Sequence, residues 1–302
     1  MSTTAAPRPA SHDQRPPGVT QNGSMSGPVV KALTLVTDDG VPIDTVHLPG
    51  DQRTAFVVAH GFTLSWQHGA VWKVASRLRE AGGVVSFDFR GHGRSGGLST
   101  LGDREIKDLD VAVRYARELG YQRIAAVGFS MGASVVLRYA GLIGGLDAAV
   151  SVSGPGHWYY RGTVPMRRVH WAVERRLGRA ITKTWLKTRI SPAGWNPVPM
   201  PPDEAAALIS PIPLLIVHGD KDLYFPVEHG QRLYDAASEP KELWIERGFG
   251  HAESGAGGPL LDRIAQWVNQ QEVNQQEVSQ QGVNQQQPLS AQAVPGLGVE
   301  EV

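Results

Sequence analysis

A serine between two glycines follows an apolar run near the middle of the chain. Residues 127–132 read Val-Gly-Phe-Ser-Met-Gly, with Ser130 at the centre and a helix-like run at 133–140 behind it. A sharp turn from strand to helix favours glycine, because side chains there would clash with the backbone. Such a turn would expose the Ser130 hydroxyl and aim helix N–H groups at developing negative charge. The alternative is an ordinary glycine-rich turn in which Ser130 caps the helix.

Candidate partners for this serine occur later in the chain. A serine hydroxyl becomes a good nucleophile when a histidine removes its proton and a carboxylate orients that histidine. Residues 218–222 read His-Gly-Asp-Lys-Asp, and residues 248–251 read Gly-Phe-Gly-His. The order serine, acid, histidine is the order that accompanies this turn motif. Asp220 and Asp222 are both candidates for the acid, and His251 is the candidate base.

Short apolar runs predict the strands that must position these groups. The runs lie at 54–60, 84–88, 123–127, 148–153, 214–218 and 243–245. Continuous apolar runs are typical of strands that are covered on both faces of a parallel sheet. Helical patterns at 69–81 and 103–120 separate some of them, and 30–50 has the pattern of a β-hairpin around Asp-Asp-Gly. The alternation predicts a mostly parallel, doubly wound α/β sheet with ligands beyond the carboxyl ends of its strands.

The composition divides the chain into five segments. We predict a disordered leader at 1–28, a core at 29–154 and 211–270, a helical cap inserted at 155–210, and a disordered tail at 271–302. The leader is rich in Pro, Ser, Thr and Gly. The tail repeats a Val-Asn-Gln-Gln-Glu pentapeptide, whose period matches neither helix nor strand.

The predicted cap is basic and aromatic. Between residues 155 and 200 it has nine Lys or Arg residues and one acid, Glu174. Met166, Val169, Val173 and Leu177 recur at helical spacing and predict one amphipathic helix. We interpret the basic residues as a solvated surface. A preference for anionic acyl groups, or contact with a membrane or an acidic partner, is the alternative.

The totals exclude several function classes. The chain has 302 residues, 41% of them hydrophobic, a formal net charge of zero and no cysteine, which excludes disulfides and thiol chemistry. No apolar run approaches the roughly 20 residues of a membrane-spanning helix, and residues 1–28 have no signal-peptide pattern. No metal-binding or phosphate-binding motif occurs. We expect a cytoplasmic protein with no metal, no cofactor, no nucleic-acid partner and no integral membrane segment, and the oligomeric state stays open.

Together these motifs resemble the α/β-hydrolase superfamily over about residues 34–268. The resemblance implies that Ser130 is the nucleophile, His251 the general base and Asp222 the acid, because members that read His-Gly-x-x-Asp use the final aspartate. It also implies that the backbone N–H groups of Phe62 and Met131 form the oxyanion hole. Asp220 remains the alternative acid.

The same resemblance implies hydrolysis of a small-molecule carboxylic ester through an acyl-serine intermediate. Esterases, serine aminopeptidase-like and monoacylglycerol-lipase-like members are the similar ones. A peptidase or amidase is therefore an alternative, and so is a non-catalytic ligand-binding protein of the same fold. His157, Trp158 and Tyr159 follow a strand end and are candidate pocket residues, with packing inside the cap as the alternative.

Overall fold

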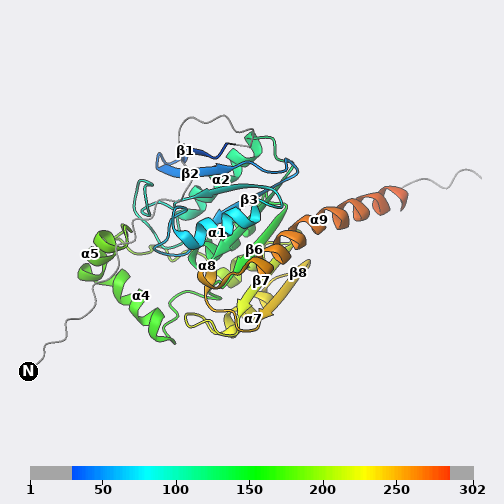
Figure 1. The fold of residues 1–302 in the computed structure, drawn as a ribbon. Helices are drawn as coiled ribbons and strands as arrows, with labels where there is room; N and C mark the ends of the chain where they lie inside the picture. The colour runs from blue at the N-terminus through cyan, green and yellow to red at the C-terminus, as the bar shows by residue number, and fades with distance from the viewer. Residues whose placement is uncertain (1–28, 286–302) are drawn as a thin grey trace, which may run out of the picture.

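The computed structural model describes residues 29–285, and for 272–285 it describes the backbone alone. Eight strands form one sheet in the order β1-β2-β4-β3-β5-β6-β7-β8 (Figure 1). β1 and β2 form the predicted antiparallel hairpin, β2 pairs antiparallel with β4, and the remaining neighbours are parallel. The predicted mostly parallel α/β sheet is confirmed. The strands are β1 (Lys31–Val36), β2 (Pro42–Leu48), β3 (Thr54–Ala59), β4 (Gly83–Phe87), β5 (Arg123–Phe129), β6 (Ala148–Val152), β7 (Leu214–Gly219) and β8 (Lys241–Glu246).

Helices cover both faces of the sheet. On one face lie α1 (Gly69–Leu78), the short α8 (Ala252–Gly255) and α9 (Gly258–Gln285), and Figure 1 shows α1 and α9 in front of the strands. On the other face lie α2 (Glu105–Glu118), α3 (Met131–Leu142) and α7 (Val227–Ala236). Each helix directs an apolar stripe at the sheet, and each buried aliphatic side chain contributes about 1.5–3 kcal/mol by leaving water. Two apolar cores therefore hold the parallel strands in place.

The parallel strands end at one edge of the sheet. The loops that follow β3, β5, β6, β7 and β8 consequently start close together. These five loops contain every residue for which the sequence predicts chemistry. The fold thus gathers at one place residues that are up to two hundred positions apart.

The cap contains two helices where the apolar spacing predicts one. α4 (Val164–Glu174) and α5 (Arg176–Trp185) lie apart from the two helical layers (Figure 1). Arg175 is extended, with φ −95° and ψ 137°, so the chain changes direction there and Leu177 belongs to α5. A Cβ at Gly178 would lie 2.7 Å from the carbonyl oxygen of Ala172. The missing side chain is what allows the two helices to approach so closely.

Two predicted segment boundaries differ from the structure. α6 (Pro202–Ala206) falls inside the predicted cap at 155–210, but it packs on α3, where a Cβ at Gly141 would lie 2.4 Å from the carbonyl oxygen of Ala205. Small buried residues let this segment join the helical layer. The predicted tail at 271–302 begins inside α9, whose backbone stays helical to Gln285, consistent with the good helix propensity of Gln and Glu. Residues 1–28 and 286–302 lie outside the described residues.

Candidate active site

Ser130 occupies a strained turn between β5 and α3. Its backbone has φ 51° and ψ −113°, a conformation that non-glycine residues rarely adopt. A Cβ at Gly128 would lie 2.4 Å from the carbonyl oxygen of Gly132, and a Cβ at Gly132 would lie 2.1 Å from the carbonyl oxygen of Ala59. Both glycines are therefore required by the close approach of α3 to its own strand and to β3. The side chain of Ser130 is left partly exposed at the strand end.

Ser130, His251 and Asp222 form a continuous hydrogen-bonded chain. Nε2 of His251 lies 3.0 Å from Oγ of Ser130, and Nδ1 of His251 lies 2.7 Å from Oδ2 of Asp222. A carboxylate only accepts hydrogen bonds, so Nδ1 carries the imidazole proton and Nε2 presents a lone pair to the serine hydroxyl. The side chain of His251 is 18% exposed and that of Asp222 is fully buried. The arrangement can accept a proton from the serine.

Asp222 is held in its ionised form by its surroundings. Burial raises the pKa of this carboxyl, but the hydrogen bond and charge of His251 and two backbone N–H groups outweigh it, and the pKa lies below its usual value. The two N–H groups belong to Tyr224 and Phe225 and donate to Oδ1 at 2.8 and 3.0 Å. Asp220, the alternative acid, accepts instead from the backbone N–H of Gly248 at 2.6 Å. Of the two candidates, it is Asp222 that contacts His251.

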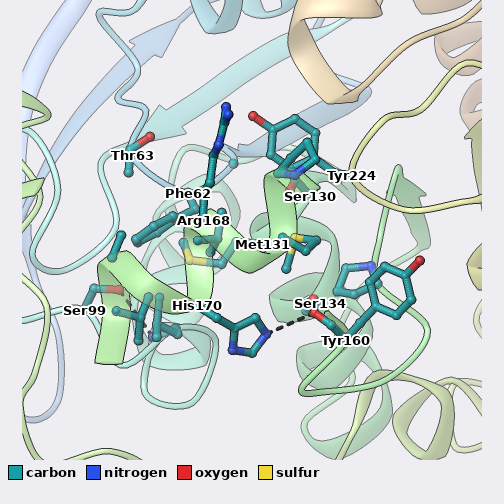
Figure 2. A pocket seen from close by; sticks show the side chains of 18 of the residues that line it. Phe62, Thr63, Ser99, Ser130, Met131, Ser134, Tyr160, Arg168, His170 and Tyr224 are labelled. Carbon is teal, nitrogen blue, oxygen red and sulfur yellow. Dashed lines mark hydrogen bonds between the residues drawn. The ribbon is translucent and has the colours of Figure 1, made fainter. Parts of the chain in front are cut away.

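The two residues whose backbone amides the sequence predicts for the oxyanion hole line the same cavity as Ser130. Phe62, Ser130 and Met131 line one cavity, and Figure 2 shows them close together. Met131 is the first residue of α3, so its N–H has no carbonyl partner within the helix. Gly61 precedes Phe62, and a Cβ at Gly61 would lie 3.4 Å from Cβ of Ser130. The loop after β3 and the start of α3 thus flank Ser130 on two sides.

A buried carboxylate that sequence reasoning missed joins two of these loops. Glu253 is 4% exposed, and its Oε1 accepts the backbone N–H of Gly61 at 2.6 Å. Burial raises the pKa of Glu253, and its side chain also lines the cavity. The sequence around Glu253, two positions after His251, gives no local signal of this contact, because its partner Gly61 lies 192 residues earlier in the chain.

The other motif residues at this edge brace the loops. His60 is fully buried, accepts the N–H of Phe89 at Nε2 and lies 2.7 Å from the carbonyl oxygen of Gly61 through Nδ1. Burial lowers the pKa of His60 to about 3, so its ring is neutral. Asp88 accepts the backbone N–H groups of two loop residues at 2.7 and 3.0 Å. These contacts hold the loops after β3 and β4 in place.

The cavity above Ser130 has a volume of about 890 Å³. Its floor comes from the strand-end loops, and its far wall comes from α4 and α5, with Arg168 and His170 of α4 visible in Figure 2. The predicted pocket residues His157, Trp158 and Tyr159 all line it. Two of them also make packing contacts: the His157 ring stacks on His229 of α7 with centroids 5.0 Å apart, and within the cap Nε1 of Trp158 donates to the carbonyl oxygen of Pro199. Pocket lining and cap packing are thus compatible.

Two further properties concern metals and membranes. Within the part of the chain that the structure describes, no group of three or more His, Cys, Asp or Glu side chains is arranged to hold a metal ion. No helix among those same residues has the length and apolar character needed to span a bilayer.

The geometry and the sequence both match a known family. The model of the alpha/beta hydrolase family matches residues 56–271. The chain belongs to this family, as the motifs predict. The match covers the serine turn, the strand-end loops and the whole cap.

Individual relatives are similar over most of the chain. A monoacylglycerol lipase of Mycolicibacterium smegmatis is 30% identical in an alignment that covers 72% of this chain and 89% of that protein. The uncharacterised protein YqkD of Bacillus subtilis is 29% identical over 74% of this chain and 73% of its own length. The structure of the Pyrococcus furiosus esterase Pf2001 superposes with a TM-score of 0.65 and 26% identity, covering 85% of this chain and 97% of that one. Hydrolases of the esterase and lipase type are therefore among its distant homologues.

Proposed function

We propose that this protein is a serine hydrolase that cleaves carboxylic esters through an acyl-Ser130 intermediate. The observation that carries the proposal is the chain of contacts from Ser130 through His251 to Asp222, at 3.0 and 2.7 Å. The similarity to a monoacylglycerol lipase and to an esterase supports an ester as the substrate. The cavity of about 890 Å³ suits a small molecule.

In the first half of the reaction Ser130 becomes acylated. Nε2 of His251 takes the hydroxyl proton while Oγ of Ser130 attacks the ester carbon, and the buried Asp222 carboxylate stabilises the resulting imidazolium. The carbonyl oxygen becomes negative and accepts hydrogen bonds from the N–H groups of Phe62 and Met131. One such donor is typically worth about 2.7–4 kcal/mol in the transition state. The bond to the leaving oxygen then breaks, and that oxygen receives the proton from His251.

In the second half water replaces the departed alcohol. His251 removes a proton from this water as its oxygen attacks the acyl carbon, and the two backbone amides again bind the negative oxygen. When the intermediate collapses, the bond to Oγ of Ser130 breaks and His251 returns its proton to that oxygen. The free acid leaves and the resting site is restored. Apart from substrate and water, the reaction uses only groups that this chain supplies. It proceeds in the cytoplasm or in any other aqueous compartment.

A fluorophosphonate probe tests the proposal directly. We expect the wild type to be labelled at Ser130 and Ser130→Ala to be unlabelled. Ser134→Ala is the matched control, since Ser134 lies one helical turn further along α3 and also lines the cavity; this variant should be labelled like the wild type. Absence of labelling in folded wild type would contradict a catalytic serine and favour a ligand-binding protein.

Graded substrates separate an esterase from an amidase. p-Nitrophenyl esters of increasing acyl length should be hydrolysed, with aminoacyl p-nitroanilides turned over far more slowly. Faster cleavage of the anilides would replace the ester assignment by the peptidase or amidase alternative, while leaving the role of Ser130 intact.

A further inference from the structure

The outer face of α5 is apolar where a surface helix is normally polar. Leu177, Ile181 and Trp185 follow one another at a spacing of four residues and are 64%, 41% and 75% exposed. Gly178 and Thr182, on a neighbouring side of the helix, are buried. Amphipathic helices of soluble domains usually turn their large apolar residues toward the core. Here the large apolar residues of α5 form a stripe that faces solvent instead.

The stripe does not serve the cavity described above. Arg179 and Thr182 of α5 and Leu186, which follows it, line the cavity, and none of the three stripe residues is among its lining. The stripe is therefore a separate surface on the far side of the cap. Figure 1 shows α5 at the outer end of the molecule, away from the sheet.

Exposed cations lie close to the stripe in the chain, and those within α5 occupy its polar side. Arg175, Arg176, Lys183 and Lys187 lie beside it in the chain and are exposed. None of the four forms an ion pair with any residue in the described ranges. Glu174, the one acid between residues 155 and 200, is already bound to Arg161 and His170. The charge of this face is thus positive and uncompensated.

We propose that this cap face, formed by the three stripe residues and the four cations, docks the protein on an anionic lipid surface. Leucine, isoleucine and tryptophan side chains insert at the boundary between headgroups and acyl chains, while lysine and arginine bind the headgroup phosphates. Each cation close to such a surface raises partitioning about fivefold. The combination of one exposed apolar stripe with flanking cations is the pattern of an interfacial helix.

A second copy of the chain fits this face less well. In a symmetric dimer the same patch of each copy meets its counterpart. The four cations of one copy would then oppose the four of the other, and Glu174, the one acid between residues 155 and 200, is already bound to Arg161. Charge repulsion thus disfavours self-association, whereas an anionic bilayer complements both the charge and the apolar stripe.

Vesicle flotation with the full chain tests the docking. We expect the wild type to float with vesicles of phosphatidylcholine and phosphatidylglycerol, and to stay in solution with phosphatidylcholine alone or at high salt. The variant Leu177→Ser/Ile181→Ser/Trp185→Ser and a variant with all four cations changed to glutamine should each lose at least tenfold in partitioning. Leu142→Ser/Ile143→Ser is the matched control, because these residues are 43% and 51% exposed at the end of α3; it should float like the wild type.

Three results would overturn the docking proposal. They are failure of the folded wild type to bind anionic vesicles, undiminished binding of the stripe variant, and a wild-type dimer in light scattering that the stripe variant abolishes. The last result would assign the face to a second copy. Hydrolysis of a soluble short-chain ester by the stripe variant should equal that of the wild type, so the test stands apart from the proposed esterase activity.

Discussion

Replacing Asp222 by asparagine should abolish most of the turnover through the tautomer of His251. Oδ1 of Asp222 accepts two backbone N–H groups, those of Tyr224 and Phe225. An asparagine must keep its carbonyl oxygen at that position, because its NH₂ group cannot accept these bonds. The NH₂ group then faces Nδ1 of His251, which has to present a lone pair. The ring proton moves to Nε2, so His251 can no longer accept the proton of Ser130.

The size of the loss follows from this geometry. A base held in the wrong tautomer costs about 10⁴-fold in kcat, which corresponds to about 5.5 kcal/mol. KM should change little, because Asp222 is fully buried and does not line the cavity. Steady-state hydrolysis of a p-nitrophenyl ester by the folded variant gives both constants.

Asp220→Asn is the matched control for this prediction. Asp220 lies two residues earlier on the same loop but accepts the N–H of Gly248, whereas it is Asp222 that contacts His251. Asparagine retains an acceptor for that bond, so kcat should stay close to that of the wild type. A folded Asp222→Asn enzyme with a tenth or more of the wild-type kcat, or an equal loss in Asp220→Asn, would refute the reasoning.

Three other perturbations test the packing around the site. Glu253→Ala should lower kcat about 10–100-fold with little change in KM. The backbone N–H of Gly61, in the loop after β3, loses its acceptor at a cost of about 1–3 kcal/mol. Glu253→Gln keeps an acceptor and should keep most of the activity. Burial raises the pKa of Glu253 in the folded state. The stability of the wild type relative to Glu253→Gln should therefore be greatest below pH 4.5 and fall as the pH rises above that value. Urea unfolding measured across this pH range tests the expectation. Arg90→Met leaves the buried carboxylate of Asp108 unpaired and should cost about 3–5 kcal/mol, a fall of about 10 °C in Tm by differential scanning fluorimetry. Gly132→Ala places a methyl group 2.1 Å from a β3 carbonyl oxygen and should prevent soluble expression, while Gly69→Ala, with nothing within 4 Å, should express normally.

The sheet was predictable because its strands have local signatures. β3, β5 and β7 each contain a continuous apolar run. The turn at Ser130 is marked by two glycines, and the structure shows that side chains at those positions would clash. The order of Ser130, Asp222 and His251 along the chain was equally visible. Each strand and each motif is determined by a few consecutive residues, so a short sequence pattern is enough to predict it.

The cap and its borders were less predictable, since their causes are not local. Apolar spacing across Val173 and Leu177 suggested one helix, but the extended backbone of Arg175 divides it. The predicted cap extends to residue 210, yet α6 within it packs on α3 because Gly141 leaves room for it. The choice between Asp222 and Asp220 likewise depended on which carboxylate reaches His251, a matter of loop direction.

The loops at the strand ends are fastened to one another, and this fastening sets the position of His251. The residue after it, Ala252, has φ 51° and donates its N–H to Oγ of Ser153, which itself has φ 52° at the end of β6. Glu253 then fixes the same segment to Gly61 in the loop after β3. Strained backbone of this kind persists only where surrounding contacts over-determine it. The distance between His251 and Ser130 therefore depends on contacts to two other strand ends. Loss of either contact should lower kcat more than it lowers the stability of the fold.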